Sequence, residues 1–248
     1  MTRKQLTFGS LFAGIGGFDL GFERAGMSCK WQVEIDDYST KVLEKHWPNV
    51  HRERDINECG KHNLEKVDII CGGFPCQDIS YAGQGAGLDG ERSGLFFEAI
   101  RLVRELEPRI VVLENVAALL TRGLDRVLGT LAEIGYDAEW HCIPAAAVDA
   151  PHLRDRVFVM AYPMHERRGL RCVLSRDTNK GQSSSNGLQY REKRQRAWDA
   201  EPDISRVVDG LSKRLEQDRK QRLKGLGNAV VPQVAEFIGK AIVERLGQ

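Results

Sequence analysis

The feature that most restricts the fold is an alternation of short apolar runs with helix-like segments over about the first 145 residues. The apolar runs predict strands at residues 5–12, 31–35, 67–71 and 109–113, with further strands at 140–143 and 157–161. Apolar residues at helical spacing predict helices at 17–25, 38–46, 95–105, 124–134 and 232–246. This order predicts the α/β class, with a mixed, mostly parallel sheet covered by helices on both faces.

The composition is typical of a folded protein in a reducing compartment. Of the 248 residues, 42% are hydrophobic and 29% are charged, as in ordinary globular domains. No apolar run is long enough to cross a bilayer, and the N-terminal residues lack the core of a signal peptide, so we expect a cytoplasmic protein without a membrane partner. The six cysteines form no C-x-x-C pair, which predicts reduced thiols and no metal site.

Basic residues are concentrated in the last part of the chain. Residues 1–150 contain 16 Lys and Arg against 23 Asp and Glu, whereas residues 151–248 contain 20 against 12. The segment 163–200 has nine basic and four acidic residues with few aliphatic ones, so it cannot supply a large core. The asymmetry favours a polyanionic partner for the C-terminal part, although a solvated basic surface would have the same composition.

A glycine-rich segment follows the first predicted strand. Phe12 begins the sequence F-A-G-I-G-G, where glycines let the backbone turn tightly and approach a ligand. Glu34 follows the second predicted strand, where an acid of a Rossmann-like sheet binds ribose hydroxyls, and Asp55 follows the second predicted helix. Together these residues suggest an adenosine ligand at the carboxyl ends of the strands. The alternative is a glycine-rich turn with unrelated surface acids.

A candidate nucleophile follows the third predicted strand. Cys76 lies in the sequence G-G-F-P-C-Q and precedes a loop, residues 78–89, whose several glycines are typical of a mobile lid. Nucleophilic attack requires the thiolate, so a nearby positive charge or base is expected to lower the pKa of this thiol. The alternative is an inert thiol.

Polar residues also follow the later strands. Glu114 and Asn115 come after the fourth predicted strand, at the same sheet edge. Arg154 and Arg156 alternate in H-L-R-D-R, so in an extended segment both face one side and can clamp a phosphate or a planar oxygen. Salt bridges to nearby acids are the alternative. The sequence G-N-A-V-V-P, beginning at Gly227, predicts a turn and an N-cap before the last helix.

Taken in order, these motifs resemble those of the DNA cytosine carbon-5 methyltransferases over most of the chain, apart from roughly residues 163–203. The pair P-C-Q and E-N-V, in this order after the glycine-rich segment, is highly specific. The resemblance implies a Rossmann-like domain that binds S-adenosyl-L-methionine. It also implies methyl transfer to a cytosine in double-stranded DNA, in the cytoplasm of a bacterial or phage-infected cell.

The resemblance assigns roles residue by residue. Cys76 would be the nucleophile that adds to carbon 6 of a flipped-out cytosine, Glu114 would face the ring nitrogen and Arg156 the ring carbonyl. Asn115 would orient the loop that carries the nucleophile, and Arg154 is counted with this catalytic group. The residues expected around the cofactor are Phe12, Gly14, Ile15, Gly16, Gly17, Glu34, Ile35, Asp55, Ile56, Phe74, Pro75, Leu95, Asn228, Ala229 and Val230.

The chain departs from the family pattern at two positions. Ile35 replaces the usual aromatic residue beside the strand-two acid, which weakens the expected stacking on adenine, and His152 replaces the usual glutamine before the arginines. The recognition region is short and basic, as in compact phage and prophage forms. We therefore expect a catalytic domain at 1–162, a target-recognition region at 163–203 and a segment at 204–248 that returns to the catalytic domain.

One chain contains every expected motif, which predicts a monomer. A cognate restriction endonuclease is a further candidate partner. Two alternative functions stay open: a relative that mainly binds DNA and methylates weakly, and an RNA cytosine-5 methyltransferase.

Overall fold

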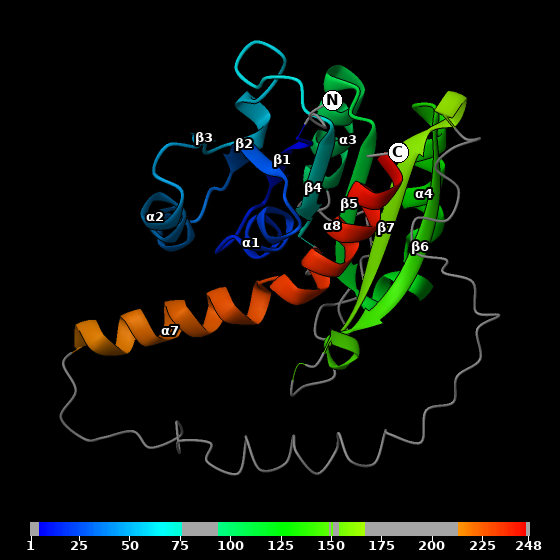
Figure 1. The fold of residues 1–248 in the computed structure, drawn as a ribbon. Helices are drawn as coiled ribbons and strands as arrows, with labels where there is room; N and C mark the ends of the chain where they lie inside the picture. The colour runs from blue at the N-terminus through cyan, green and yellow to red at the C-terminus, as the bar shows by residue number, and fades with distance from the viewer. Residues whose placement is uncertain (1–4, 76–93, 149, 151–153, 167–212, 247–248) are drawn as a thin grey trace.

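The computed structural model describes residues 5–75, 94–148, 150, 154–166 and 213–246. These residues contain a seven-stranded sheet with helices on both faces (Figure 1). The strands are β1 (Thr7–Leu11), β2 (Ser28–Val33), β3 (His51–Glu53), β4 (Ile69–Gly73), β5 (Ile110–Val116), β6 (Tyr136–Pro144) and β7 (Asp155–Pro163). The helices are α1 (Gly17–Arg24), α2 (Asp37–His46), α3 (Gly94–Leu106), α4 (Leu124–Glu133), α7 (Lys213–Asn228) and α8 (Pro232–Leu246), with 3-10 turns η1 (Ile56–Glu58), η4 (Ala117–Thr121), η5 (Ala145–Val148) and η6 (Met164–Glu166).

The sheet is mixed but mostly parallel, as the alternation of strands and helices predicted. Its strand order is β3-β2-β1-β4-β5-β7-β6. The first five strands in this order pair in parallel, and β7 lies antiparallel between β5 and β6. The predicted strands and helices all occur, with ends shifted by a few residues. The short strand β3 was not predicted, because its three residues are polar and show no apolar alternation.

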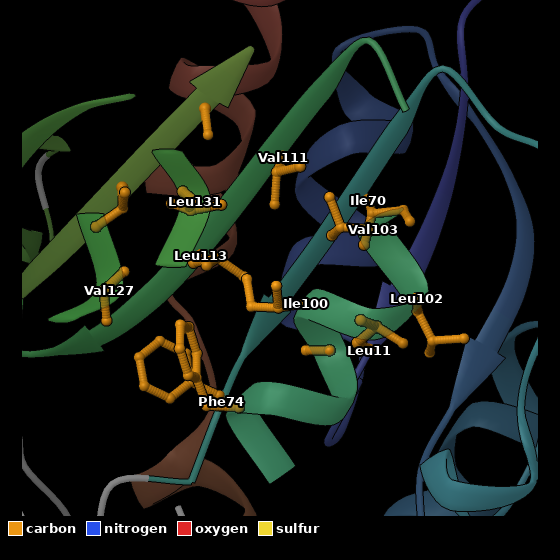
Figure 2. Packing of buried hydrophobic residues seen from close by; sticks show 14 of the residues in the cluster. Leu11, Ile70, Phe74, Ile100, Leu102, Val103, Val111, Leu113, Val127 and Leu131 are labelled. Carbon is orange, nitrogen blue, oxygen red and sulfur yellow. The ribbon is translucent and has the colours of Figure 1, made fainter. Parts of the chain in front are cut away.

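Alternating strand residues build two separate cores, one on each face of the sheet. Ile70 and Leu113 belong to the core that α3 and α4 cover, and Figure 2 shows Leu113 of β5 beside Ile100 of α3. Their sequence neighbours Ile69 and Val112 belong to the opposite core, which α1 and α8 cover. Both faces are therefore buried, which explains why these strands are continuous apolar runs.

Helix α8 returns the C-terminal part of the chain to the first helix. A Cβ atom at Gly21 of α1 would lie 2.4 Å from Cβ of Ala235 and 2.5 Å from the carbonyl oxygen of Pro232. Gly239 of α8 approaches α1 as closely, because its Cβ would lie 2.8 Å from Cβ of Ala25. The two helices pack backbone against backbone, and this contact positions the segment that precedes α8.

A buried polar cluster ties α1 to the ends of β1 and β2. Asp19 of α1 accepts hydrogen bonds from Ser10 Oγ at 3.1 Å and from Gln32 Nε2 at 2.7 Å. Gln32 Oε1 in turn accepts two bonds from Arg52. Burial raises the pKa of Asp19, and the hydrogen bonds from Gln32 and Ser10 oppose this rise. The cluster fixes the first two strands where the glycine-rich turn begins.

The expected N-cap at the sequence G-N-A-V-V-P is wrong. Asn228 is the last residue of α7 and does not begin a helix, while α8 starts at Pro232 as predicted. Gly and Asn are common at helix C-termini as well as in turns, and the sequence alone does not distinguish the two uses. Within the described residues, no helix combines the length and the apolarity needed to span a membrane.

Candidate active site

A cavity of about 710 Å³ lies at the carboxyl ends of the parallel strands. In open α/β sheets this edge is where ligands bind, and the volume is that of a site for a cofactor-sized molecule. Most of the predicted site residues line it: Phe12, Gly14, Glu34, Ile35, Asp55, Ile56, Phe74, Pro75, Leu95, Glu114, Asn115, Arg156, Asn228 and Ala229. The fold therefore brings most of these residues together at one edge of the sheet, and their roles there stay predictions.

The turn after β1 brings the backbone up to the cavity. Phe12 and Gly14 have φ angles of 51° and 57°, in the left-handed region that glycine adopts without strain. The N–H of Gly14 donates to Glu34 Oε2 at 2.7 Å, and the N–H of Ala13 donates to the carbonyl of Val33 at 3.1 Å. The turn is thereby attached to the end of β2, and its glycine leaves the backbone open to a ligand.

Three of the predicted cofactor residues in this turn do not line the cavity. A Cβ at Gly16 would lie 2.4 Å from the ring of Trp47, and a Cβ at Gly17 would lie 2.3 Å from the carbonyl oxygen of Val230. Ile15 packs against Gly225 of α7. Gly16 thus makes room for Trp47 after α2, Gly17 makes room for the backbone before α8, and Ile15 contacts α7, so the contribution of these three residues in this structure is packing.

Glu34 is a buried carboxylate whose two oxygens face backbone donors. Oε2 accepts from the N–H of Gly14, and Oε1 accepts from the N–H of Asp36 at 2.7 Å. Each carboxylate oxygen accepts two hydrogen bonds, so one position on each remains for a ligand. A fixed carboxylate of this kind suits a pair of neighbouring hydroxyl donors, such as those of a ribose.

Apolar side chains also line the cavity. Ile56 is buried, whereas Ile35 is 67% exposed and offers an aliphatic surface at the rim. Asp55 accepts from the N–H of Asn57 at 2.9 Å and caps the turn η1. Phe74 packs on Phe96 with ring centroids 5.0 Å apart. A flat heteroaromatic ring fits between such surfaces better than a charged group does.

Glu114 and Arg156, which also line the cavity, form an ion pair. Arg156 Nε lies 2.9 Å from Glu114 Oε1, and the pairing of β5 with β7 brings the two residues together. Burial raises the pKa of Glu114 from 4.5 to about 7, although Arg156 and Arg154 lower it. A carboxyl group with this pKa is partly protonated at neutral pH and can donate a hydrogen bond to a ring nitrogen.

Space for the Glu114 carboxyl depends on a glycine in the neighbouring strand. A Cβ at Gly73 of β4 would lie 2.7 Å from Glu114 Oε2. Gly73 lines the cavity but was not among the predicted site residues. Gly73 is the second glycine of the motif G-G-F-P-C-Q, and a glycine there could have indicated that another side chain approaches the backbone closely.

Asn115 connects the strand of Glu114 to the segment before Cys76. Its Nδ2 donates to the carbonyl of Phe74 at 3.2 Å, and its Oδ1 accepts from the N–H of Val116 at 2.8 Å. Pro75 lines the cavity immediately after this contact. Cys76 itself, the loop 78–89 and His152 lie outside the described residues. The predicted orienting role of Asn115 stays a prediction, and its bond to Phe74 is the contact that the role requires.

Arg154 does not share the orientation of Arg156. The extended segment begins at Asp155, and Arg154 before it has a φ of 37°, so the expected alternation does not reach it. Arg154 is not part of the cavity lining, and its guanidinium donates to the carbonyls of Gly227 and Ala229, two residues that do line the cavity. Val230, a predicted cofactor residue, is also outside that lining and is buried in the core beside α1.

Several lining residues were missed by the sequence interpretation. Lys224 of α7 pairs with Asp36 at 3.3 Å, and both border the cavity together with Ser39, Arg54 and Gln221. Asp36 also caps α2 by accepting from the N–H of Ser39. Only weak signals in the sequence indicated that these residues line the cavity. Asp36 closely follows Glu34, and Lys224 shortly precedes Gly227.

The described cysteines are poor nucleophiles. Burial raises the pKa of Cys29, Cys59, Cys71 and Cys142, that of Cys59 to about 11. A thiol with a raised pKa supplies little thiolate at neutral pH. Among residues 5–75, 94–148, 150, 154–166 and 213–246, no cluster of His, Cys, Asp and Glu could hold a metal ion.

The chain is similar to known methyltransferases. A Type II methyltransferase of Dactylococcopsis salina, M.DsaV, is 32% identical over 68% of this chain and 49% of its own length. The Type II methyltransferase M.HhaI of Haemophilus parahaemolyticus is 34% identical over 64% of this chain and 50% of its own length. This chain thus spans about half the length of these curated relatives.

A solved structure shares the fold. It belongs to a protein assigned as a DNA modification methyltransferase that is encoded within an Escherichia coli prophage. The two structures superpose with a TM-score of 0.56 at 25% identity, over 66% of this chain and 48% of the other. The sequence profile of the C-5 cytosine-specific DNA methylases matches residues 6–207. The chain therefore belongs to the C-5 cytosine-specific DNA methylase family.

Proposed function

We propose that this protein transfers a methyl group from S-adenosyl-L-methionine to carbon 5 of a cytosine in double-stranded DNA. The observation that carries the proposal is the Glu114 carboxyl, with a pKa of about 7, paired with Arg156 in the same cavity as Glu34. A proton donor for a ring nitrogen and a carboxylate for a ribose are thereby joined in one site. Family membership narrows the ring to cytosine.

The residues present fit the cofactor. Glu34 has acceptor positions left for the ribose hydroxyls, and Ile35 and Ile56 offer aliphatic surfaces for the adenine. Gly14 and Phe12 would lie along the remainder of the cofactor. Asn228, from the C-terminal part of the chain, would close the cavity around it. When bound, S-adenosyl-L-methionine supplies a methyl group activated by a positively charged sulfur.

The residues of the chain prepare the cytosine to accept that group. Carbon 5 is a weak nucleophile, so we propose that the Cys76 thiolate first adds to carbon 6 and makes carbon 5 electron-rich. Glu114 gives its proton to the ring nitrogen during this addition, and Arg156 contacts the ring carbonyl while it holds Glu114 in place. After carbon 5 carries the methyl group, the ring nitrogen returns its proton to the Glu114 carboxylate. A base such as water then takes the remaining proton from carbon 5, the electron pair of that C–H bond forms the 5,6 double bond, and the Cys76 sulfur leaves as the thiolate. Because a stacked base exposes neither ring face, the cytosine must leave the duplex first.

The proposal predicts that Cys76 is indispensable. Labelled S-adenosyl-L-methionine and duplex DNA should give labelled DNA with the wild-type chain, and Cys76→Ser should lower the rate by more than roughly a thousandfold. Cys142→Ser, which alters an exposed thiol on the edge strand β6, is the matched control and should keep the wild-type rate. DNA with 5-fluorocytosine should trap a covalent adduct, visible on a denaturing gel.

Any different outcome of these experiments would contradict a specific part of the proposal. An adduct that persists in Cys76→Ser would mean that another residue is the nucleophile. Transfer to RNA but not to DNA would make the chain an RNA methyltransferase. DNA binding without transfer to any DNA would make it a binding protein that has lost catalysis. Sedimentation of the active species would test the expected monomer.

A further inference from the structure

Arg154, which directly precedes β7, connects this strand to the end of α7. Its Nη2 atom donates to the carbonyl oxygens of Gly227 at 2.6 Å and Ala229 at 2.7 Å. More than 70 residues separate these partners from Arg154 along the chain. Two residues after Arg154, Arg156 pairs with Glu114. One short segment thus carries both the ion pair and a bond to the C-terminal part.

The backbone at Arg154 is held against its intrinsic preference. A φ of 37° is unfavourable for a residue with a side chain, and such a conformation persists only where the surroundings impose it. Strand β7 fixes the chain from Asp155 onward, and the two carbonyl contacts fix the guanidinium at the other end of the side chain. The strained conformation aims the side chain at residues 227–229 instead of into the cavity.

Residues 227–229 comprise the end of α7 and the first residue of the link to α8, and they are attached to the rest of the fold on both sides. Upstream, α7 is attached to α2 through the ion pair of Lys224 with Asp36. Downstream, Val230 is buried against Gly17 of α1. Asn228 lies between the two carbonyls that Arg154 binds, and it lines the cavity. Arg154 therefore sets the path of the backbone on both sides of Asn228.

We propose that Arg154 is a positioning residue that holds residues 227–229 in the shape that closes the cofactor cavity. The inference rests on the proposed function, since the ligand closed in by these residues is S-adenosyl-L-methionine. Arg154 acts through the backbone of the link, while Arg156 contacts the cytosine and Glu114. Loss of Arg154 should therefore weaken cofactor binding and leave the chemical step at saturating cofactor largely intact.

Arg154→Met keeps the apolar stem and removes the donors. Calorimetric titration with S-adenosylhomocysteine should give a dissociation constant roughly tenfold above that of the wild type. The KM for S-adenosyl-L-methionine should rise by a similar factor, while kcat should stay within about threefold. Arg154→Lys, which keeps the charge and fewer donors, should give intermediate values. Arg104→Met, at an exposed arginine of α3, is the matched control and should change neither constant.

The outcomes that would overturn this inference differ from those that would contradict the proposed function. A fall in kcat with unchanged KM would overturn the inference and give Arg154 a direct role at the base. A lower melting temperature with unchanged cofactor affinity would make the contact structural only. If Arg154→Met does not fold, Arg154→Lys decides, and an unchanged KM in that variant overturns the inference. Failure of the wild type to bind the cofactor would instead contradict the proposed function.

Discussion

At the scale of single residues, Glu114 shows burial prevailing over an ion pair. Its pKa is about 7 in the folded chain despite Arg156 at 2.9 Å, against an ordinary value of 4.5. Below pH 4.5 the Glu114 carboxyl is protonated in both the folded and the unfolded chain. At higher pH it ionises first in the unfolded chain, because its pKa there is lower. The unfolding free energy that this difference contributes is therefore lost as the pH rises through about 7. Between about pH 5 and pH 8 the wild type should lose about 2 kcal/mol of unfolding free energy relative to Glu114→Gln.

Urea denaturation at several pH values measures this difference. Glu44→Gln, which alters an exposed glutamate of α2, is the control and should follow the wild type across the range. A difference between the wild type and Glu114→Gln that does not change with pH would contradict the prediction. It would mean that Arg156 keeps the carboxyl ionised and that burial is the weaker effect.

At the scale of elements, α1 and α8 are joined by a contact that only glycine permits. Alanine at Gly21 would meet Ala235 and the carbonyl of Pro232, so Gly21→Ala should lower the unfolding free energy by about 1 to 3 kcal/mol. Gly129, inside α4, has open space around its Cβ direction. Gly129→Ala should raise the unfolding free energy by up to about 1 kcal/mol, because alanine is the better helix former.

The two substitutions make the same chemical change inside two helices, so urea denaturation of both separates packing from helix propensity. If Gly21→Ala stabilised the chain as Gly129→Ala does, the close approach of α1 and α8 would be contradicted. The result matters for the site as well, because the same pair of helices holds Val230 and the link before it.

The sequence predicted the elements more completely than it predicted side-chain directions. Apolar periodicity identified the long strands and the helices α1, α2, α3, α4 and α8, because burial leaves a regular apolar signal. It did not reveal β3, which has too few residues to show a period. The motifs placed Glu34 and Glu114 in one cavity. They did not reveal that Gly16 and Gly17 serve helix packing, since sequence does not say which side of a turn a glycine leaves open.

The predicted orientation of Arg154 was wrong for a related reason. The alternation of H-L-R-D-R is informative only while the backbone is extended, and a positive φ at Arg154 ends that condition. Its partners are backbone carbonyls far along the chain, and backbone groups leave no trace in a sequence pattern. Asn228 shows the same limit, because its identity suits the end of a helix as well as the start of one.

At the scale of the whole molecule, the two parts of the chain have opposite charge balance. If the chain binds DNA as proposed, the excess of bases in residues 151–248 predicts that its C-terminal part makes the phosphate contacts. Each phosphate contact releases about one counterion, so the salt dependence of binding counts the contacts. Changing Arg191, Lys193 and Arg194 together to Gln should reduce the slope of log affinity against log salt by about three and weaken binding to all sequences similarly.

A matched triple variant separates local contact from net charge. Lys41, Lys45 and Lys61 are exposed in the acidic part, and changing them to Gln removes the same total charge. If phosphate contacts lie in the basic segment, this control keeps the wild-type slope, because exposed charges far from DNA are screened within about 10 Å at moderate salt. Equal slopes for the two triple variants, measured by fluorescence anisotropy over a salt series, would contradict the prediction. The charge asymmetry would then act on solubility alone, and DNA would be held by the walls of the cavity.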